Sequence, residues 1–278
     1  MQCYRPISVK GLIVPCGKCP ACLANIRQEW CFRLNSEYLA CSFGLFVTLT
    51  YDDAHLPADL SVNKRDVQLF LKRLRKELGN HSFRYFITAE YGDNTHRPHY
   101  HGLFFFSVPF SPGIYDQITR NWKNGFCDFG DIEPASVAYC TKYCMKQTKV
   151  PDERKPTFRL TSRRPCIGYH YLQANSAYHI QTCNLSRASL PWSTARLPRL
   201  FRDKLKDNFT ADYFIDRDRL AEQQARQRLE KAYNAWYRIH GKEYSSPIDA
   251  DYAFAEFING QKQRQQELLA KRIKKQKL

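Results

Sequence analysis

The segment RPHYHGLFFF at residues 97–106 constrains the fold of this chain more than any other stretch. It ends in a run of large apolar side chains, which is typical of a buried strand. Side chains two residues apart on a strand point to the same face, so His99 and His101 would present their imidazoles side by side, with Tyr100 turned away. The segment therefore predicts a sheet that carries two potential metal ligands on one face.

A second strand is expected directly before the histidine strand. Residues 83–92, FRYFITAEYG, are rich in β-branched and aromatic side chains, and the polar stretch DNTHRP follows them. This pattern predicts an antiparallel hairpin, which would bring Glu90 next to the histidines. Two imidazoles and a carboxylate suit Mg²⁺, Mn²⁺ or a related ion and leave positions for a phosphate oxygen. We interpret His99, His101 and Glu90 as the ligands of a divalent ion; the alternative is a pair of exposed histidines without a metal.

Two tyrosines, each with a lysine three residues later, follow in the segment YCTKYCMK at residues 139–146. Pro134 and the residues after it predict a helix. On that helix Tyr139 and Tyr143 would share one face. Lys142 and Lys146 would lie on the same side, where their charge would help a phenol to react as a nucleophile. The alternative is that the tyrosines add area to the core and the lysines extend along the surface.

The remaining patterns predict an α+β protein with a central antiparallel sheet and flanking helices. A further strand is expected at residues 45–50. A helix is expected to begin at Asn63, with Asp66 in a capping-box position, and to end at Gly79. The basic, proline-containing residues 151–170 are typical of a loop, and less regular sequence follows them.

Charge and composition point to a polyanionic partner. Lysine and arginine outnumber aspartate and glutamate by 43 to 27, which gives a formal net charge of +16 spread along the chain. Nucleic acid is the natural inference, and a basic surface kept for solubility is the alternative. The sequence holds no apolar run long enough to span a bilayer and no signal-like N-terminal core, so we expect a cytoplasmic protein with no membrane partner.

Four cysteines near the N-terminus have the spacing C-x12-C-x2-C-x2-C: Cys3, Cys16, Cys19 and Cys22. The chain has eleven cysteines in all, an odd number that does not suggest a disulfide framework. Closely spaced thiolates in a reducing compartment favour a structural Zn²⁺ site. Buried or free thiols are the alternative, and an iron–sulfur cluster has less support.

The order of these motifs resembles the HUH endonuclease superfamily, specifically the rolling-circle replication initiators of microviruses of the gokushovirus branch. The resemblance lies in the strand LFVTLTYDD, the strand ending in AEYG, the motif RPHYHG and the pattern YxxKYxxK, together with CGKCPAC and RRPCIGYHY. It covers about residues 1–170.

The resemblance implies a metal-dependent tyrosine endonuclease and strand transferase. It assigns His99, His101 and Glu90 as metal ligands and Tyr139 and Tyr143 as nucleophiles. One tyrosine would nick single-stranded or cruciform DNA at the phage origin, form a 5′-phosphotyrosine link and later rejoin the displaced strand. Helicase and DNA polymerase would come from the bacterial host, in whose cytoplasm the protein would act.

This interpretation divides the chain into three parts. We expect a cysteine-rich segment with a first helix over residues 1–40, the HUH endonuclease domain over residues 41–200, and a basic helical region over residues 201–278. Two other functions remain open. One is a two-tyrosine HUH transposase, and the other is a non-catalytic DNA-binding or packaging protein with a zinc module.

Overall fold

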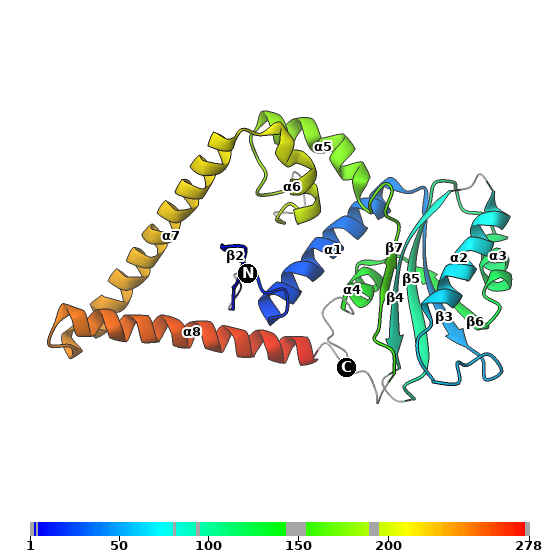
Figure 1. The fold of residues 1–278 in the computed structure, drawn as a ribbon, viewed down its shortest axis with the longest axis horizontal. Helices are drawn as coiled ribbons and strands as arrows, with labels where there is room; N and C mark the ends of the chain where they lie inside the picture. The colour runs from blue at the N-terminus through cyan, green and yellow to red at the C-terminus, as the bar shows by residue number, and fades with distance from the viewer. Residues whose placement is uncertain are drawn as a thin grey trace. The chain divides into compact units, whose positions relative to one another are not determined.

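The computed structural model of this chain describes residues 3, 5–79, 82–92, 95–142, 154–188 and 195–275. The chain forms two compact units, shown in Figure 1. One unit comprises Ala24–His179 and Ser186–Arg199; the other comprises Met1–Leu23, Ile180–Leu185 and Leu200–Leu278. Among the described helices, none is both long enough and apolar enough to cross a membrane.

The first unit is built on a five-stranded antiparallel sheet with the strand order β6-β3-β5-β4-β7. The strands are β3 (Phe43–Tyr51), β4 (Phe83–Tyr91), β5 (Pro98–Phe106), β6 (Gly125–Asp131) and β7 (Arg159–Thr161). The helices of this unit are α1 (Pro20–Ala40), whose first residues belong to the other unit, α2 (Lys64–Leu78), α3 (Ile114–Asn121), α4 (Pro134–Lys142) and α5 (Tyr169–Gln181). The predicted α+β fold with a central antiparallel sheet and flanking helices is confirmed.

The sheet is covered on both faces, so each strand contributes to two cores (Figure 1). Tyr100 and Phe104 of β5 pack in the core formed with α2 and α3. Leu103 and Phe105, on the alternate positions of the strand, pack in the core formed with α1 and α4. Burial on both faces explains why the end of β5 is a continuous apolar run, because neither set of side chains meets water.

The predicted helix over residues 64–78 has the boundaries that its caps specify. The Asn63 side chain accepts a hydrogen bond from the backbone N–H of Arg65, and the Gly79 N–H donates to the carbonyl of Arg75. Asp66, expected to take part in a capping box, instead accepts a hydrogen bond from the Tyr51 hydroxyl at 2.7 Å. The cap and the glycine stop therefore depend on local chemistry, while Asp66 is used to tie the helix to β3.

Two elements appear where the sequence predicted irregular structure. The three-residue strand β7 lies inside the stretch expected to be a loop, and α5 occupies residues 169–181. The strand β7 pairs with β4, opposite Phe86, Ile87 and Thr88. A strand this short has too few residues to show a period of two, so tertiary pairing alone defines it.

The second unit contains a short hairpin and the C-terminal helices. The elements are β1 (Ile7–Val9), β2 (Leu12–Val14), α6 (Arg199–Leu205), η1 (Lys206–Asn208), α7 (Ala211–His240), η2 (Gly241–Glu243) and α8 (Pro247–Lys275). The strands β1 and β2 pair in antiparallel fashion. A small core of Trp236, Ala250 and Phe254 joins α7 to α8. The cysteine-rich N-terminal segment and the helical C-terminal region predicted from the sequence are both present.

Candidate active site

The polar site lies on the sheet face that also packs against α1 and α4, beyond the end of the apolar core. Antiparallel pairing places Glu90 directly opposite His99 and Thr88 directly opposite His101. Directly opposed residues project to the same face. The imidazoles of His99 and His101 stack almost parallel, with ring centroids 6.4 Å apart and planes 3° apart. The sheet therefore brings together the three side chains that the sequence assigned to a metal.

His101 is held by groups on both sides of its ring. Its Nε2 lies 2.6 Å from Oε1 of Glu90, and its Nδ1 lies 3.1 Å from Oγ1 of Thr48 on β3. Phe46, also on β3, stacks parallel to the ring at 5.9 Å. With 7% of its surface exposed, His101 has little freedom to turn. The sequence analysis did not single out Thr48, which lies in the LFVTLTYDD strand on the same alternating positions as Phe46.

The tautomer of His99 follows from its main-chain partner. Its Nδ1 lies 2.6 Å from the carbonyl oxygen of Arg97. A carbonyl oxygen only accepts hydrogen bonds, so Nδ1 carries the proton and the lone pair of the neutral ring is on Nε2. A Cβ atom on Gly92 would lie 3.3 Å from Cε1 of His99, so the turn leaves little space beside the ring. His99 is therefore set to bind a cation through Nε2.

Tyr139 reaches this site from α4. Its hydroxyl donates a hydrogen bond to Oε1 of Glu90 at 3.0 Å and lies 3.4 Å from Nε2 of His101. Its ring meets the His101 ring edge-to-face, with centroids 4.9 Å apart. The residue is 37% exposed, so solvent reaches the side chain. A phenol, a carboxylate and two imidazoles thus converge at one place.

The position of α4 depends on contacts with α1. Cys140 and Val137 are buried in the core of this face. Oγ1 of Thr141 lies 3.2 Å from Sγ of Cys31, and Arg27 donates a hydrogen bond to the carbonyl of Ala138 at 3.2 Å. These contacts flank Tyr139 on the helix and hold its side chain against the sheet.

The other predicted site residues on this helix are placed only in part. Lys142 is the last residue of α4. Tyr143 and Lys146 lie outside the described residues. The shared helical face of the two tyrosines therefore stays a prediction.

Two further residues on the same face were not identified as site residues from the sequence. Arg159 on β7 is paired with Thr88, and its guanidinium lies 4.6 Å from the centre of the Trp30 ring. Phe126 on the edge strand β6 is paired with Thr50, and 68% of its surface is exposed. The alternation in GFCDFGD was the signal for Phe126, because it places every second residue of β6 on this face.

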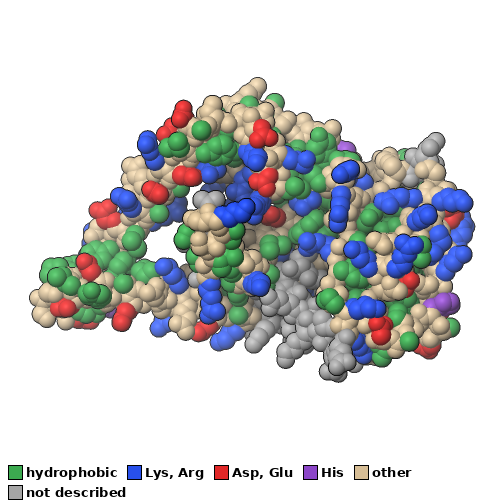
Figure 2. Space-filling view, in the orientation of Figure 1, with side chains coloured by type: hydrophobic (Ala, Val, Ile, Leu, Met, Phe, Trp, Pro, Cys, Tyr) green, Lys and Arg blue, Asp and Glu red, His purple; other side chains and the backbone are tan. Residues whose placement is uncertain are grey.

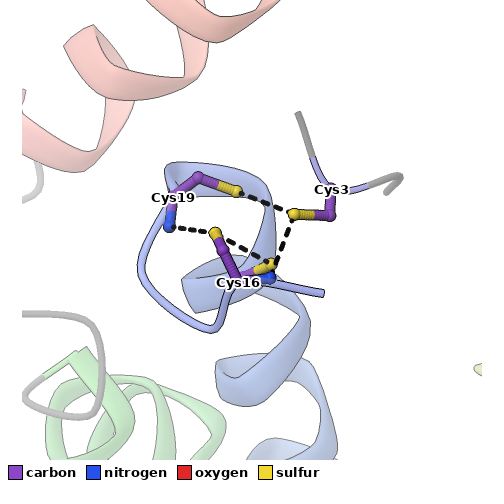
Figure 3. A group of neighbouring side chains, drawn as sticks. Cys3, Cys16 and Cys19 are labelled. Carbon is purple, nitrogen blue, oxygen red and sulfur yellow. Dashed lines mark hydrogen bonds between the residues drawn. The ribbon is translucent and has the colours of Figure 1, made fainter. Parts of the chain in front are cut away.

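The cysteine motif forms a second site in the other unit (Figure 3). The four sulfur atoms of Cys3, Cys16, Cys19 and Cys22 all lie within 4.8 Å of one another. The separation is 3.8 Å between Cys3 and Cys19 and 4.0 Å between Cys16 and Cys22. A tetrahedral ion with metal–sulfur bonds of about 2.3 Å requires sulfur atoms about 3.8 Å apart. The cluster has the donor set and spacing of a metal site.

Backbone N–H groups surround the first thiols of this cluster. The N–H of Cys19 donates to Sγ of Cys16, and the N–H of Cys16 donates to Sγ of Cys3, each at 3.3 Å. Hydrogen bonds from the backbone of Lys18 and Cys19 lower the pKa of Cys16 to about 6. Burial raises the pKa of Cys22 to about 12. The loop thus stabilises negative charge on sulfur at Cys16, while Cys22 lies at its buried edge.

Comparison with known proteins identifies relatives of this chain. A family model for the replication-associated protein ORF2 matches residues 44–148, which include β3 to β6 and Tyr139. The replication-associated protein VP4 of Bdellovibrio phage phiMH2K is 29% identical over 275 residues, covering 81% of this chain and 86% of that protein. This chain is a relative of the microvirus replication-associated proteins. The resemblance inferred from its motifs is confirmed.

Two other relatives extend the comparison. The replication-associated protein ORF2 of Spiroplasma virus 4 is 32% identical over 160 residues, covering 50% of each chain. The replication-associated protein ORF4 of Chlamydia phage 1 is 24% identical over 237 residues, covering 77% of this chain and 58% of that protein. Both relatives are therefore matched over only part of their length.

A solved structure gives a weaker likeness. The N-terminal nuclease domain of the non-structural protein 1 of minute virus of mice matches 75% of this chain and 90% of its own length at 12% identity, with a TM-score of 0.17. A TM-score this low does not establish a common fold.

Proposed function

We propose that this chain is a replication initiator endonuclease that nicks one DNA strand at a phage origin through a tyrosine. The observation that carries the proposal is the position of the Tyr139 hydroxyl, 3.0 Å from Oε1 of Glu90 and 3.4 Å from Nε2 of His101. A phosphate bound at these groups would lie within reach of the phenol oxygen. The similarity to replication-associated proteins of phages supports the same function.

In this proposal His99, His101 and Glu90 hold a divalent ion, Mg²⁺ or Mn²⁺. The donor set fits such an ion, because His99 keeps a lone pair on Nε2 and Glu90 offers a carboxylate beside His101. When bound, the ion would supply Lewis-acid chemistry by drawing charge from a phosphodiester. Thr48 would fix the orientation of the His101 ring.

The nick is a transfer of phosphorus from a deoxyribose oxygen to the tyrosine. The Tyr139 oxygen would bond to phosphorus as the bond to the 3′ oxygen breaks, leaving a 5′-phosphotyrosine and a 3′-hydroxyl. The phenol proton would pass to Glu90, whose carboxylate already accepts its hydrogen bond, and the leaving oxygen would take up a proton. Because the new linkage keeps the energy of the broken one, the reverse reaction rejoins the strand without ATP.

Tyr143 is proposed as the second nucleophile. While one tyrosine holds the 5′ end, the other would cut the regenerated origin and release a circle. Lys142 and Lys146 would stabilise negative charge on the phosphate or the phenolate. Strand extension and unwinding would be performed by the DNA polymerase and helicase of the bacterial host, in its cytoplasm.

The surroundings of the site suit a single strand. Phe126 exposes an aromatic ring on the same face, two strands away from β5. Neighbouring strands lie about 4.8 Å apart, so the ring is about 10 Å from His99, a distance that one or two nucleotides span. An exposed ring beside the cut phosphate would stack on a base.

Formation of a covalent adduct tests this function. Fluorescently labelled fragments of the encoding phage's single-stranded genome would be incubated with the protein and Mn²⁺, then separated under denaturing conditions. We expect a protein–DNA adduct that the double variant Tyr139→Phe/Tyr143→Phe abolishes and that the control Tyr252→Phe, an exposed tyrosine on α8, retains. An adduct that persists in the double variant would overturn the tyrosine assignment.

Two other outcomes of this assay would favour the alternative functions. Tight binding of the fragments without any adduct would favour a non-catalytic DNA-binding or packaging protein. Joining of the bound strand to an unrelated duplex would favour a two-tyrosine transposase.

We also propose that the cysteine cluster holds one structural Zn²⁺ ion. The support is the set of sulfur separations, which four thiolates around a tetrahedral ion would require. Such an ion would join residue 3 to the start of α1 across the β1–β2 hairpin. Sites of this kind contribute directly to folding, because the ligands converge only in the folded state.

Metal content distinguishes a zinc site from free thiols. We expect one zinc per chain by elemental analysis of the purified protein. The variant Cys19→Ser should lose most of it, while Cys183→Ser, an exposed cysteine outside the cluster, should keep it. Iron with visible absorption would indicate an iron–sulfur cluster instead, and a metal-free protein that unfolds like the metal-loaded one would overturn the proposal.

A further inference from the structure

The outward face of α2 carries a stripe of positive charge. Figure 2 shows Lys and Arg side chains gathered over this helix. Four of them are exposed and follow one side of the helix, and we call them the α2 stripe: Lys64, Arg65, Lys72 and Lys76. The helix packs on the sheet face that contains Tyr100 and Phe104, opposite to the face of His99 and His101. The stripe and the candidate active site therefore lie on different sides of the sheet.

The acidic residues of α2 do not neutralise this stripe. Asp66 accepts a hydrogen bond from the buried Tyr51 hydroxyl at 2.7 Å. Glu77 is paired with Arg120 and Asn121 of α3. Both carboxylates are thus directed to neighbours within the unit. The outward side of the helix keeps a net positive charge.

We propose that the α2 stripe binds the phosphate backbone of double-helical DNA. The exposed side chains of α2 are all polar or charged, and none is aromatic. Proteins that bind single strands use aromatic rings on which bases stack, whereas contacts to a duplex backbone require only positive charge. The helix is about 22 Å long, enough to follow several phosphates of a duplex. The stripe has the chemistry of a duplex-backbone contact and lacks that of a single-strand platform.

An acidic membrane surface fits the stripe less well. A helix that lies in a membrane interface exposes an apolar side that enters the acyl region. Of the apolar side chains of α2, Leu69 is half-buried. The others are buried in the protein core: Val67, Phe70, Leu71, Leu74 and Leu78. The helix thus has no exposed apolar side to offer a bilayer.

The role of this contact rests on the proposed function. The protein would hold duplex DNA on the α2 side while the strand to be cut lies on the side of Tyr139. Binding of the duplex adds affinity that does not depend on the active site. The two surfaces can therefore be tested separately.

The test compares two variants that each remove four positive charges. The α2 variant replaces all four residues of the stripe by glutamine. The control variant removes four exposed charges from the other unit: Arg226→Gln, Arg228→Gln, Lys231→Gln and Lys242→Gln. Binding of a duplex about 30 base pairs long, roughly three turns of B-DNA, would be measured by fluorescence anisotropy from about 50 to 200 mM salt. Thermal unfolding would check that both variants fold.

We expect the α2 variant to bind the duplex at least about tenfold more weakly than the control variant at low salt. Loss of four phosphate contacts should also reduce the slope of log affinity against log salt by about 3 to 4. The covalent adduct with single-stranded DNA should form in both variants. The active-site variant Tyr139→Phe should keep duplex binding, so failure of the nicking proposal would not affect this measurement.

Two results would overturn the proposal. Equal loss of duplex binding in the α2 and control variants would mean that only net charge matters. Binding of the wild-type protein to phosphatidylserine vesicles, lost in the α2 variant while duplex binding persists, would assign the stripe to a membrane surface.

Discussion

The hydroxyl of Tyr139 donates a hydrogen bond to Oε1 of Glu90 at 3.0 Å, although the two residues are 49 positions apart in the chain. The same carboxylate oxygen lies 2.6 Å from Nε2 of His101. Glu90 is therefore shared by the proposed nucleophile and the proposed metal site. Its replacement should affect both functions at once.

The variant Glu90→Gln keeps the shape of the side chain and removes its charge. We expect Mn²⁺ affinity to fall at least about tenfold, because a neutral amide is a poorer ligand for a hard cation. The rate of adduct formation should fall at least about a hundredfold at saturating Mn²⁺, because the proton acceptor of Tyr139 is also lost. Calorimetric titration and single-turnover kinetics measure the two effects. Unchanged Mn²⁺ affinity would remove Glu90 from the ligand set, and Glu133→Gln, an exposed control, should change neither.

The variant Thr48→Val removes the hydroxyl that lies 3.1 Å from Nδ1 of His101 and keeps the β-branched shape. We expect Mn²⁺ affinity to fall by about 10- to 100-fold, as is typical when the partner that orients a ligating histidine is lost. Thr50→Val changes the same face beside His99 and serves as the control. Equal affinities for the two variants would show that Thr48 does not orient the ring.

The variant Gly125→Ala should destabilise the start of β6. Gly125 has a φ of 146°, and a Cβ there would lie 2.3 Å from the backbone nitrogen of Asp52. The residue must therefore shift, and we expect a loss of more than about 1 kcal/mol in the free energy of unfolding. Gly113→Ala, where a Cβ would meet nothing within 4 Å, is the control. Urea unfolding measures both, and equal stability of the two variants would contradict the strain at Gly125.

Alkaline pH should weaken the sheet unit through two buried tyrosines. Burial raises the pKa of Tyr100 to about 12 and raises the pKa of Tyr51 above its usual range. A phenol whose pKa is higher in the folded state stabilises the fold below the unfolded pKa and loses that effect as pH rises toward the folded pKa. We expect the urea midpoint to fall between about pH 10 and pH 12. A midpoint that is flat over this range would show that these hydroxyls ionise as easily in the folded protein.

Local pattern was sufficient to predict part of the site. The period of two along a strand places His99 and His101 on one face wherever the strand is placed. A short polar turn between two strands predicts their antiparallel pairing, and this pairing sets Glu90 opposite His99. These relationships involve residues that are near in sequence, so spacing alone carries the information.

Other features had no local signal strong enough to reveal them. The strand β7 has three residues and forms only because β4 offers it an edge. The spacing of Cys3, Cys16, Cys19 and Cys22 made a metal site one of several interpretations. Their convergence within 4.8 Å depends on how the β1–β2 hairpin folds back on the start of α1.

The sequence by itself determined the kinds of groups at the site and the face of the strand on which two of them lie. Only the tertiary structure decided that Tyr139 meets them, because that contact depends on α4 packing against α1 and the sheet through Val137 and Cys140. It also decided that Thr48, from a strand 53 residues earlier, holds His101. Spacing along one element is fixed by backbone geometry, whereas contacts between distant elements depend on how their buried faces pack together.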